Sequence, residues 1–264
     1  MPASTTTAPT ASLLDLKPLV IAALHLPDFK SETRDMARLE DYLLTNLAAF
    51  DDAGVPAVII QDQTREAGAA PIETVAMMAS LVRLARRAHP QVALGVIIQA
   101  HDAEAPLAIA HAAGASFVRL KVYVGAAMTS EGSREALGPR ARNARLALGR
   151  PDIAILTDVH DRTAIPIGDV SLIQACQWAQ GLGADGLILT GADFAESLAR
   201  IAAARKVEIK RKLLIGGGVD PGNVRQALAA ADGVIVSRAM MRDGPGSSRW
   251  DPDRVRRFMD AARP

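Results

Sequence analysis

A carboxylate and an imidazole lie two residues apart in Thr157-Asp158-Val159-His160, directly after the apolar run Ile153-Ala154-Ile155-Leu156. On an extended backbone, residues two apart point the same way, so Asp158 and His160 would share one side of the chain. Such a pair suits a general base oriented by its neighbour, or two ligands of a metal ion. The structural alternative is an aspartate that caps the next loop and a histidine that is merely hydrogen-bonded. We favour a catalytic or metal-binding role for the pair because it ends an apolar run.

Three more polar residues follow apolar runs and are candidate catalytic residues: His25, Asp62 and Asp102. Each aspartate could act as an acid or a base, or could bind a ribose hydroxyl. Each could instead cap its loop. His25 could serve as a base or as a hydrogen-bonding residue at the rim of a site.

Lys121 is the fourth candidate of this kind, and it shares a side-chain register with Arg119. It could pair with Asp102 or Asp158, bind a substrate anion, or form a Schiff base if burial lowered its pKa. A structural ion pair is the alternative.

A run of three glycines, Gly216, Gly217 and Gly218, follows another apolar run, and Ser237 with Arg238 follows the last one. Glycines let backbone N–H groups approach an anion closely, and Arg238 would add a positive charge. These five residues predict a phosphate-binding site. The alternative is a tight turn from a strand into a helix.

The elements that carry these residues follow a repeated pattern, in which a helix-like run ends in a small turn before an apolar β run. The turns are anchored at Gly54, Gly114, Gly183 and Ala230, which lie 47 to 69 residues apart. Glycine suits the end of a helix because it adopts positive φ without a steric penalty. The spacing fits two βα units, so the pattern predicts a (β/α)₈ TIM barrel, whose chemistry lies at the carboxyl ends of its strands.

The apolar runs predict eight strands at residues 19–24, 58–60, 93–98, 117–122, 153–156, 186–189, 213–215 and 233–236. We expect helices at 32–53, 72–88, 104–113, 170–180, 194–206 and 252–262, another that ends near 148, and one that opens at Pro221. Residues 125–138 read as a glycine-containing loop. The chain is thus predicted to be a disordered tail at 1–12 and a single barrel domain at 13–264.

Composition excludes several classes of protein. The 264 residues suit one closed barrel, and the 30 basic and 29 acidic residues give a net charge of +1, which offers no electrostatic basis for binding nucleic acid. No apolar run has the length of a membrane span. The single cysteine, Cys176, excludes an internal disulfide and is expected to be buried. Residues 1–12 lack the features of a secretory signal, so we expect a cytoplasmic protein.

Several short motifs together resemble the BtpA/SgcQ family of TIM-barrel proteins, over about Lys17 to Met259. The motifs are Lys17-Pro18-Leu19-Val20 with His25-Leu26-Pro27, Gly125-Ala126-Ala127-Met128-Thr129-Ser130-Glu131-Gly132, Thr157-Asp158-Val159-His160, Leu189-Thr190-Gly191, Gly216-Gly217-Gly218-Val219 and Asp253-Arg254-Val255-Arg256-Arg257-Phe258-Met259. The resemblance implies the barrel fold. Members of the family are associated by name with photosystem I biogenesis, and others look like enzymes of sugar or nucleoside utilisation.

His25, Asp158 and His160 fit the pattern of that family, whereas four other positions depart from it. The chain has Gln61-Asp62 where Glu-Asn is expected, His101-Asp102 in place of Asn-Asp, Lys121 in place of Asn, and Arg162-Thr163 in place of Lys-His. These departures fall at the predicted barrel mouth, so the resemblance implies an altered substrate or reaction.

The leading hypothesis is an enzyme that acts on a phosphorylated sugar or nucleoside-like molecule. Asp158 and His160 would move a proton or activate water, and Lys121 would stabilise negative charge. Isomerisation, aldol-type cleavage and glycosidic hydrolysis all fit this set. A divalent metal held by His25, Asp158 and His160 is an open alternative, although the spacing carries no zinc signature.

Two other classes of function stay open: a non-catalytic assembly factor of the BtpA type, and a barrel that senses a phosphorylated metabolite. The expected partner is a phosphorylated small molecule, and a homo-oligomer is also left open by the sequence.

Overall fold

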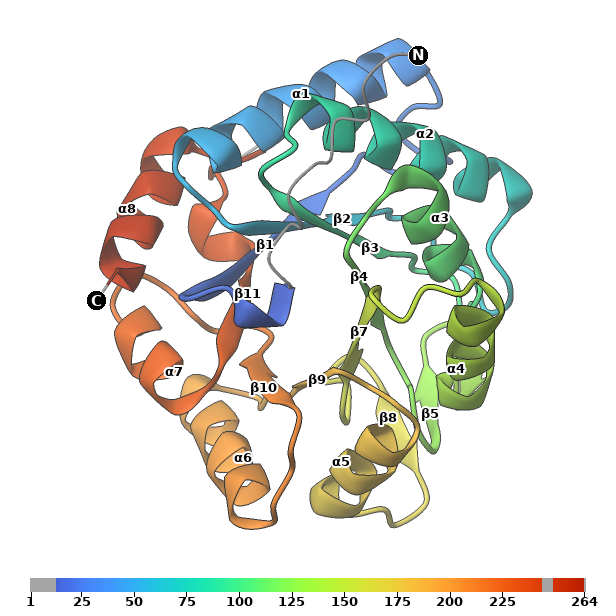
Figure 1. The fold of residues 1–264 in the computed structure, drawn as a ribbon, viewed down its shortest axis with the longest axis vertical. Helices are drawn as coiled ribbons and strands as arrows, with labels where there is room; N and C mark the ends of the chain where they lie inside the picture. Colours follow the sequence, from blue (N-terminus) through green and yellow to red (C-terminus); the bar gives the residue numbers. More distant parts are fainter. Residues whose placement is uncertain (1–12, 244–248, 264) are drawn as a thin grey trace, which may run out of the picture.

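The computed structural model describes residues 13–243 and 249–263. The predicted tail at 1–12 lies outside these residues. Eight parallel strands close into a barrel in the order β1-β11-β10-β9-β7-β4-β3-β2, with helices around it (Figure 1). The predicted TIM barrel is therefore confirmed.

The eight barrel strands lie close to the predicted apolar runs. Their bounds are β1 Leu19–His25, β2 Ala57–Gln61, β3 Ala93–Ile97, β4 Phe117–Leu120, β7 Ala154–Asp158, β9 Gly186–Ile188, β10 Lys212–Ile215 and β11 Gly233–Val236. The helices are α1 Met36–Asp52, α2 Ile72–Ala88, α3 Ala105–Ala113, α4 Gly138–Ala147, α5 Leu172–Gly181, α6 Phe194–Lys206, α7 Val224–Ala230 and α8 Pro252–Ala262.

Two helices begin three or four residues later than predicted, in each case because side chains bind the backbone ahead of them. Asp35 accepts a hydrogen bond from the N–H of Ala37 and caps α1. The carboxylate of Asp220 accepts from the N–H groups of Gly222 and Asn223, which makes a turn at Pro221 and delays α7 to Val224.

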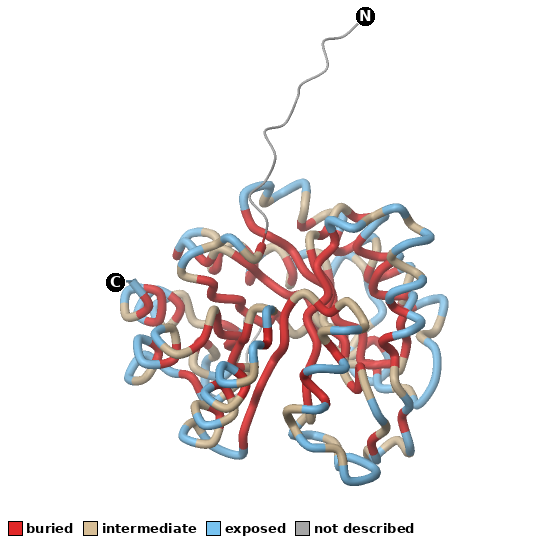
Figure 2. The backbone as a smooth tube through the Cα atoms, turned by 60° about the horizontal axis from the view of Figure 1, so that its bottom comes forward, coloured by how far each residue is buried: buried red, intermediate tan, exposed pale blue. Residues whose placement is uncertain are grey.

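The strands are buried on both sides, while the outer faces of the helices are exposed (Figure 2). Alternate residues of each strand pack either outward against the helices or inward in the barrel, as the period of two along a strand requires. The inward set forms its own apolar cluster, which includes Ile21, Ile59, Phe117 and Leu156. Glycine makes room where this interior is crowded: a Cβ at Gly95 would lie 2.2 Å from the ring of Phe117.

A short 3₁₀ helix, η1 (Leu13–Asp15), lies over one end of the barrel (Figure 1). Leu13 is buried and belongs to the interior cluster, with Leu14 and Leu16 partly buried against it. This segment covers part of the barrel end that lies away from the carboxyl ends of the strands.

The segment predicted as a loop at 125–138 instead contains a β-hairpin. Strands β5 (Ala126–Thr129) and β6 (Gly132–Glu135) pair with each other, and β5 also pairs with β8 (Ile165–Ile167). This three-stranded antiparallel sheet is formed by the segments that follow β4 and β7.

Cys176 is buried in α5, as predicted, and burial raises the pKa of its thiol to about 11. In the described part of the chain, no helix has the length and apolar character needed to cross a membrane.

Candidate functional site

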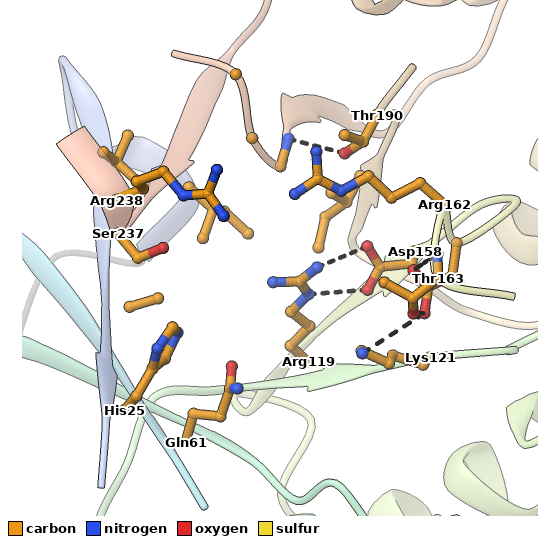
Figure 3. Close-up of a pocket in the computed structure, with 18 of the residues that line it drawn as sticks. His25, Gln61, Arg119, Lys121, Asp158, Arg162, Thr163, Thr190, Ser237 and Arg238 are labelled. Atoms are coloured by element: carbon orange, nitrogen blue, oxygen red, sulfur yellow. Dashed lines mark hydrogen bonds and ion pairs between the residues drawn. The ribbon is translucent and has the colours of Figure 1, made fainter. Parts of the chain in front are cut away.

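A cavity of about 710 Å³ opens at the carboxyl ends of the barrel strands (Figure 3). Its charged and histidine side chains come from the ends of six strands or the loops after them: His25, Arg65, Arg119, Lys121, Asp158, His160, Asp161, Arg162, Asp220, Arg238 and Arg249. This is the end at which TIM-barrel enzymes carry their active sites.

The inward register of the strands builds the floor of this cavity. In β7, Ala154 and Leu156 pack inside the barrel, so the next inward residue is Asp158. By the same alternation, Arg119 and Lys121 follow Phe117 on the inward side of the chain at β4. His25 lies at the mouth for the same reason, at the end of β1.

Arg119 and Asp158 form a bidentate ion pair between neighbouring strands. The Nε of Arg119 donates to Oδ2 of Asp158 at 2.8 Å, and Nη2 donates to Oδ1 at 2.7 Å. The two side chains are only 13% and 5% exposed. Burial lowers the pKa of Arg119, but the charge and hydrogen bonds of Asp158 outweigh it and raise that pKa above its ordinary value.

His160 lines the same cavity but does not continue the strand. Its φ of 54° is positive, so the prediction that Asp158 and His160 share one side through an extended backbone is wrong. Asp158 is bound by Arg119 instead. Burial, followed by the charge of Arg200, lowers the pKa of His160, which favours a neutral imidazole.

Lys121 pairs with Asp161, at 3.6 Å between Nζ and Oδ2, and not with Asp102 or Asp158 as predicted. Asp161 also accepts hydrogen bonds from the N–H of Thr163 at 3.0 Å and from its hydroxyl at 2.8 Å. Burial raises the pKa of Asp161, but Lys121 and the hydrogen bonds from Thr163 outweigh it and hold the pKa below its usual value. The sequence analysis missed Asp161, although it lies only three residues beyond Asp158.

His25 faces the cavity from β1, and its ring lies edge-on to Trp250, with 5.8 Å between ring centroids. Burial, with the positive charges of Arg249, Arg119 and Lys121, lowers the pKa of His25 to about 4. The imidazole is therefore neutral near pH 7.

Asp62 and Asp102 are not among the residues that line the cavity. Asp62 accepts hydrogen bonds from the N–H groups of Gln99 and Thr64, and its burial raises its pKa to about 7. Asp102 accepts from the N–H groups of Ala70, Glu104 and Ala105, ahead of α3. The catalytic role predicted for both is not supported by this geometry, and the loop-cap alternative accounts for them.

The five predicted phosphate-site residues all line the cavity. The N–H of Gly216 donates to the hydroxyl of Thr190 at 3.1 Å, so this glycine packs against β9 and its N–H is already used. Gly218 has a φ of +72°, which explains glycine there. A Cβ at Gly217 would lie 3.3 Å from the guanidinium of Arg162, so Arg162 lies directly over this loop.

Arg162 was noticed in the sequence only as a departure from a family pattern, and the structure brings it to the glycine loop. The ion pairs found at the cavity among the described residues are Arg119–Asp158, Lys121–Asp161 and Arg65–Glu131. Arg162 and Arg238 therefore have no carboxylate partner within that set. Both point into the cavity (Figure 3).

The cavity carries a surplus of positive charge. Six cationic side chains and three carboxylates line it, counting only residues that the structure describes, whereas the whole chain has a net charge of +1. An anion bound between the arginines would neutralise this surplus, and neutral imidazoles beside it could accept a proton.

The geometry of the cavity supports a bound metal ion less well than it supports a bound anion. Within residues 13–243 and 249–263, no group of three or more His, Cys, Asp or Glu side chains could hold a metal ion. His25, Asp158 and His160 thus do not form the ligand set considered from the sequence, and Asp158 is occupied by Arg119.

Comparisons with known proteins agree with the fold. The model of the BtpA family matches residues 16–264. The photosystem I biogenesis protein BtpA of Synechocystis sp. is 34% identical over 171 residues, which cover 64% of this chain and 59% of that protein. The chain thus spans under two thirds of that relative's length. An uncharacterized protein of Archaeoglobus fulgidus is 31% identical over 256 residues, covering 92% of this chain and 97% of that protein.

Solved structures of other proteins share the barrel fold. KGPDC from Streptococcus mutans superposes with a TM-score of 0.58 at 14% identity, covering 92% of this chain and 96% of that one. N-(5′-phosphoribosyl)anthranilate isomerase from Pyrococcus furiosus superposes with a TM-score of 0.56 at 12% identity, covering 92% of this chain and 97% of that one. At these identities the likeness shows the fold alone.

We predict that Asp158→Asn lowers the free energy of unfolding by about 3 kcal/mol, because it leaves the Arg119 guanidinium buried without its counter-charge. Urea unfolding of Asp158→Asn, Arg119→Gln and the double variant measures the coupling energy. Arg150 and Asp152 form a pair of the same bidentate geometry on the surface, so removing Asp152 is the matched control, with an expected effect of about 0–1 kcal/mol. Equal effects at the two pairs would contradict the prediction.

We also predict that His25 makes stability depend on pH. Between about pH 6.5 and pH 4 the unfolded chain binds a proton at this histidine that the folded chain does not, so the free energy of unfolding falls as pH falls through that window. Between pH 7 and pH 5, the free energy of unfolding of His25→Gln should fall by on the order of 1 kcal/mol less than that of the parent protein. Urea unfolding at both pH values tests this, with the exposed His111→Gln as control. An identical loss in His25→Gln and the parent would refute it.

Proposed function

The chain belongs to the BtpA family, and from that premise we propose that it is an enzyme that acts on a phosphorylated sugar or nucleoside-like molecule at the mouth of its barrel. One observation carries this proposal: Arg162 and Arg238 face one cavity beside Gly217 and Gly218 without a carboxylate partner among the described residues. Guanidinium groups that face each other repel, and a bound phosphate would turn that repulsion into attraction.

In this proposal the phosphate lies between the loops that follow β10 and β11. Gly217 and Gly218 give it access to the backbone, Ser237 offers a hydroxyl, and Arg238 contributes charge from one side. Arg162 covers the same loop from the side of β7. The loop after the last two barrel strands is the common phosphate site of TIM-barrel enzymes.

The reaction that fits best is proton transfer next to a carbonyl group, as in isomerisation or aldol-type cleavage. His25 and His160 are the groups that could accept a proton, since both are kept neutral by burial and nearby positive charge. Arg119, held in place by Asp158, faces the cavity and would stabilise the oxyanion that forms when the proton leaves. Lys121 adds positive charge nearby.

Glycosidic hydrolysis fits less well because it generally uses two carboxyl groups, one as acid and one as base or nucleophile. All three carboxylates of the cavity are engaged. Asp158 is bound by Arg119, Asp161 by Lys121 and Thr163, and Asp220 by backbone N–H groups.

A second candidate function, a non-catalytic assembly factor, is favoured by a different observation. The relative from Synechocystis is named for photosystem I biogenesis, and an apolar face is exposed on the antiparallel sheet. Met128 pairs with Ile165 in the register of β5 and β8, and Ile167 lies beside them; these side chains are 46%, 72% and 47% exposed. A partner protein could bind there.

For phosphate binding, we predict that Arg238→Ala and Arg162→Ala each raise the Kd for inorganic phosphate at least tenfold, because a hydrogen bond to a charged group contributes about 1.5–3 kcal/mol. Isothermal titration calorimetry measures this, with Arg142→Ala on the exposed side of α4 as the control. An unchanged Kd in both variants would remove the phosphate site from the proposal. Binding of a phosphate ester without turnover would favour the sensor.

The two candidate functions predict opposite results in cells that require this protein. An enzyme should lose its effect in Arg162→Ala and keep it in Ile165→Glu, because only the first change alters the mouth. An assembly factor should show the reverse. Complementation of a strain that lacks the gene, with protein levels checked by immunoblot, separates them; retention in Arg162→Ala would count against the enzyme.

A further inference from the structure

The wall of the cavity opposite the predicted phosphate site differs chemically from the rest. It is formed by the ends of β2 and β3 and carries three glutamines: Gln61, Gln63 and Gln99. In the closed barrel, three strands separate β3 from β10 in either direction, so Gln99 lies half a barrel away from the glycine loop. Gln61 and Gln63 follow β2, which β1 and β11 separate from β10 on the shorter side. Figure 3 shows Gln61 beside His25, across the cavity from Arg162.

The inward register explains why amides occupy this wall. Ile59 and Ile97 pack inside the barrel, so Gln61 and Gln99 take the next inward positions of β2 and β3. Gln63 follows two residues after Gln61. Gln61 is thus directed into the cavity by its strand, whereas Gln63 and Gln99 lie two residues beyond the ends of β2 and β3.

The side-chain amides of these glutamines have no hydrogen-bond partner among the residues that the structure describes. The Nε2 atom of Gln63 is buried and has no hydrogen-bond partner among the described residues. Gln99 is only 8% exposed. Its backbone N–H donates to Asp62 and its carbonyl oxygen accepts from Arg134. Its side-chain amide forms no hydrogen bond with the described residues. A buried amide left unpaired costs about 1–3 kcal/mol, so these groups are expected to bind a ligand or water.

The chemistry of an amide selects its ligand. Each glutamine offers two N–H donors and a carbonyl acceptor, so three of them present both functions on one wall. A hydroxyl group is also both donor and acceptor, whereas a phosphate or carboxylate only accepts. The wall therefore matches a chain of hydroxyl groups better than it matches a second anion.

The cavity offers little to a nucleobase. Its described lining includes no Phe, Tyr or Trp; the apolar side chains there are Ala23, Ile188, Val219, Ile235, Val236 and Ala239. Trp250, the aromatic residue next to His25, is fully buried behind it. Proteins that bind a base commonly stack it on an aromatic ring, a surface that this lining lacks.

We infer that the substrate is a sugar phosphate without a base, whose hydroxyl groups bind Gln61, Gln63 and Gln99 while its phosphate binds half a barrel away. This inference rests on the proposed function, because it takes the phosphate site as given. The carbon chain then crosses the barrel axis between His25 on one side and Arg119 with Asp158 on the other, where a proton can be moved.

The test is a set of Kd values measured by isothermal titration calorimetry on the intact protein. The probes are inorganic phosphate, phosphates of three- to six-carbon sugars including ribose 5-phosphate, and uridine 5′-monophosphate, which is ribose 5-phosphate with a base. We expect at least one sugar phosphate to bind ten times more tightly than inorganic phosphate, and uridine 5′-monophosphate to bind no more tightly than ribose 5-phosphate.

Variants of the amide wall add a second readout. Gln99→Leu and Gln61→Met should reduce the advantage of the sugar phosphate over inorganic phosphate about tenfold and leave the Kd of inorganic phosphate unchanged. Gln177→Met, on α5 away from the mouth, is the matched control, and melting temperatures report folding. If a glutamine variant does not fold, the Kd values of the different probes for the parent protein still test the inference.

Sugar phosphates that bind no more tightly than inorganic phosphate, or a nucleotide that binds ten times more tightly than ribose 5-phosphate, would overturn the inference and leave the phosphate site standing. Failure of every probe, inorganic phosphate included, would instead overturn the proposed function, and the inference with it.

Discussion

The Arg119–Asp158 ion pair is the interaction on which the rest of the mouth depends. It joins neighbouring strands β4 and β7 one step above the apolar residues Phe117 and Leu156. At that depth neither charge is stable without the other, so each fixes the position of its partner. The pair gives the cavity a rigid polar floor, and two of the five N–H groups of Arg119 are committed to it, which leaves the others to face the cavity.

With that pair and the Lys121–Asp161 pair neutralised, the remaining charge of the cavity has a definite place. It lies on Arg162 and Arg238, around the glycine loop, and on Arg249, near His25, in a chain that is otherwise nearly neutral. Concentrating cations in a concave site raises the local potential and attracts anions. Burial is the main reason why the pKa of His25 is lowered, and the same field adds to it, since Arg249, Arg119 and Lys121 all disfavour a protonated imidazole.

The fold could be predicted because the sequence patterns that determine it are local. Parts of the site could not be predicted because they depend on contacts between segments that are distant in the sequence. The bounds of α2, α6 and α8 follow from amphipathic runs, whereas the β5–β6 hairpin is completed by β8, some thirty residues further on. The period of two also shows why Asp62 is outside the cavity: Ile59 and Gln61 face inward, so Asp62 faces outward. Asp102 is out of phase with the inward residues of β3 in the same way. The position of Arg162 depends on the turn at His160, which no periodicity reveals.

The mouth divides into three kinds of wall, and their order around the barrel constrains the chemistry. The glycine loop and Arg238 follow β10 and β11, and the amide wall follows β2 and β3. Between these two walls lie His25 on β1, on one side, and Arg119 on β4 with His160 after β7, on the other. In the proposed binding mode, a ligand held at both ends presents its middle to His25 and Arg119. Since the residues proposed to bind the two ends are separate from the groups between them, a change at Gln61 or Arg162 would alter which molecule is held without altering the barrel. That separation explains how one family fold can be retained while the residues of its mouth diverge.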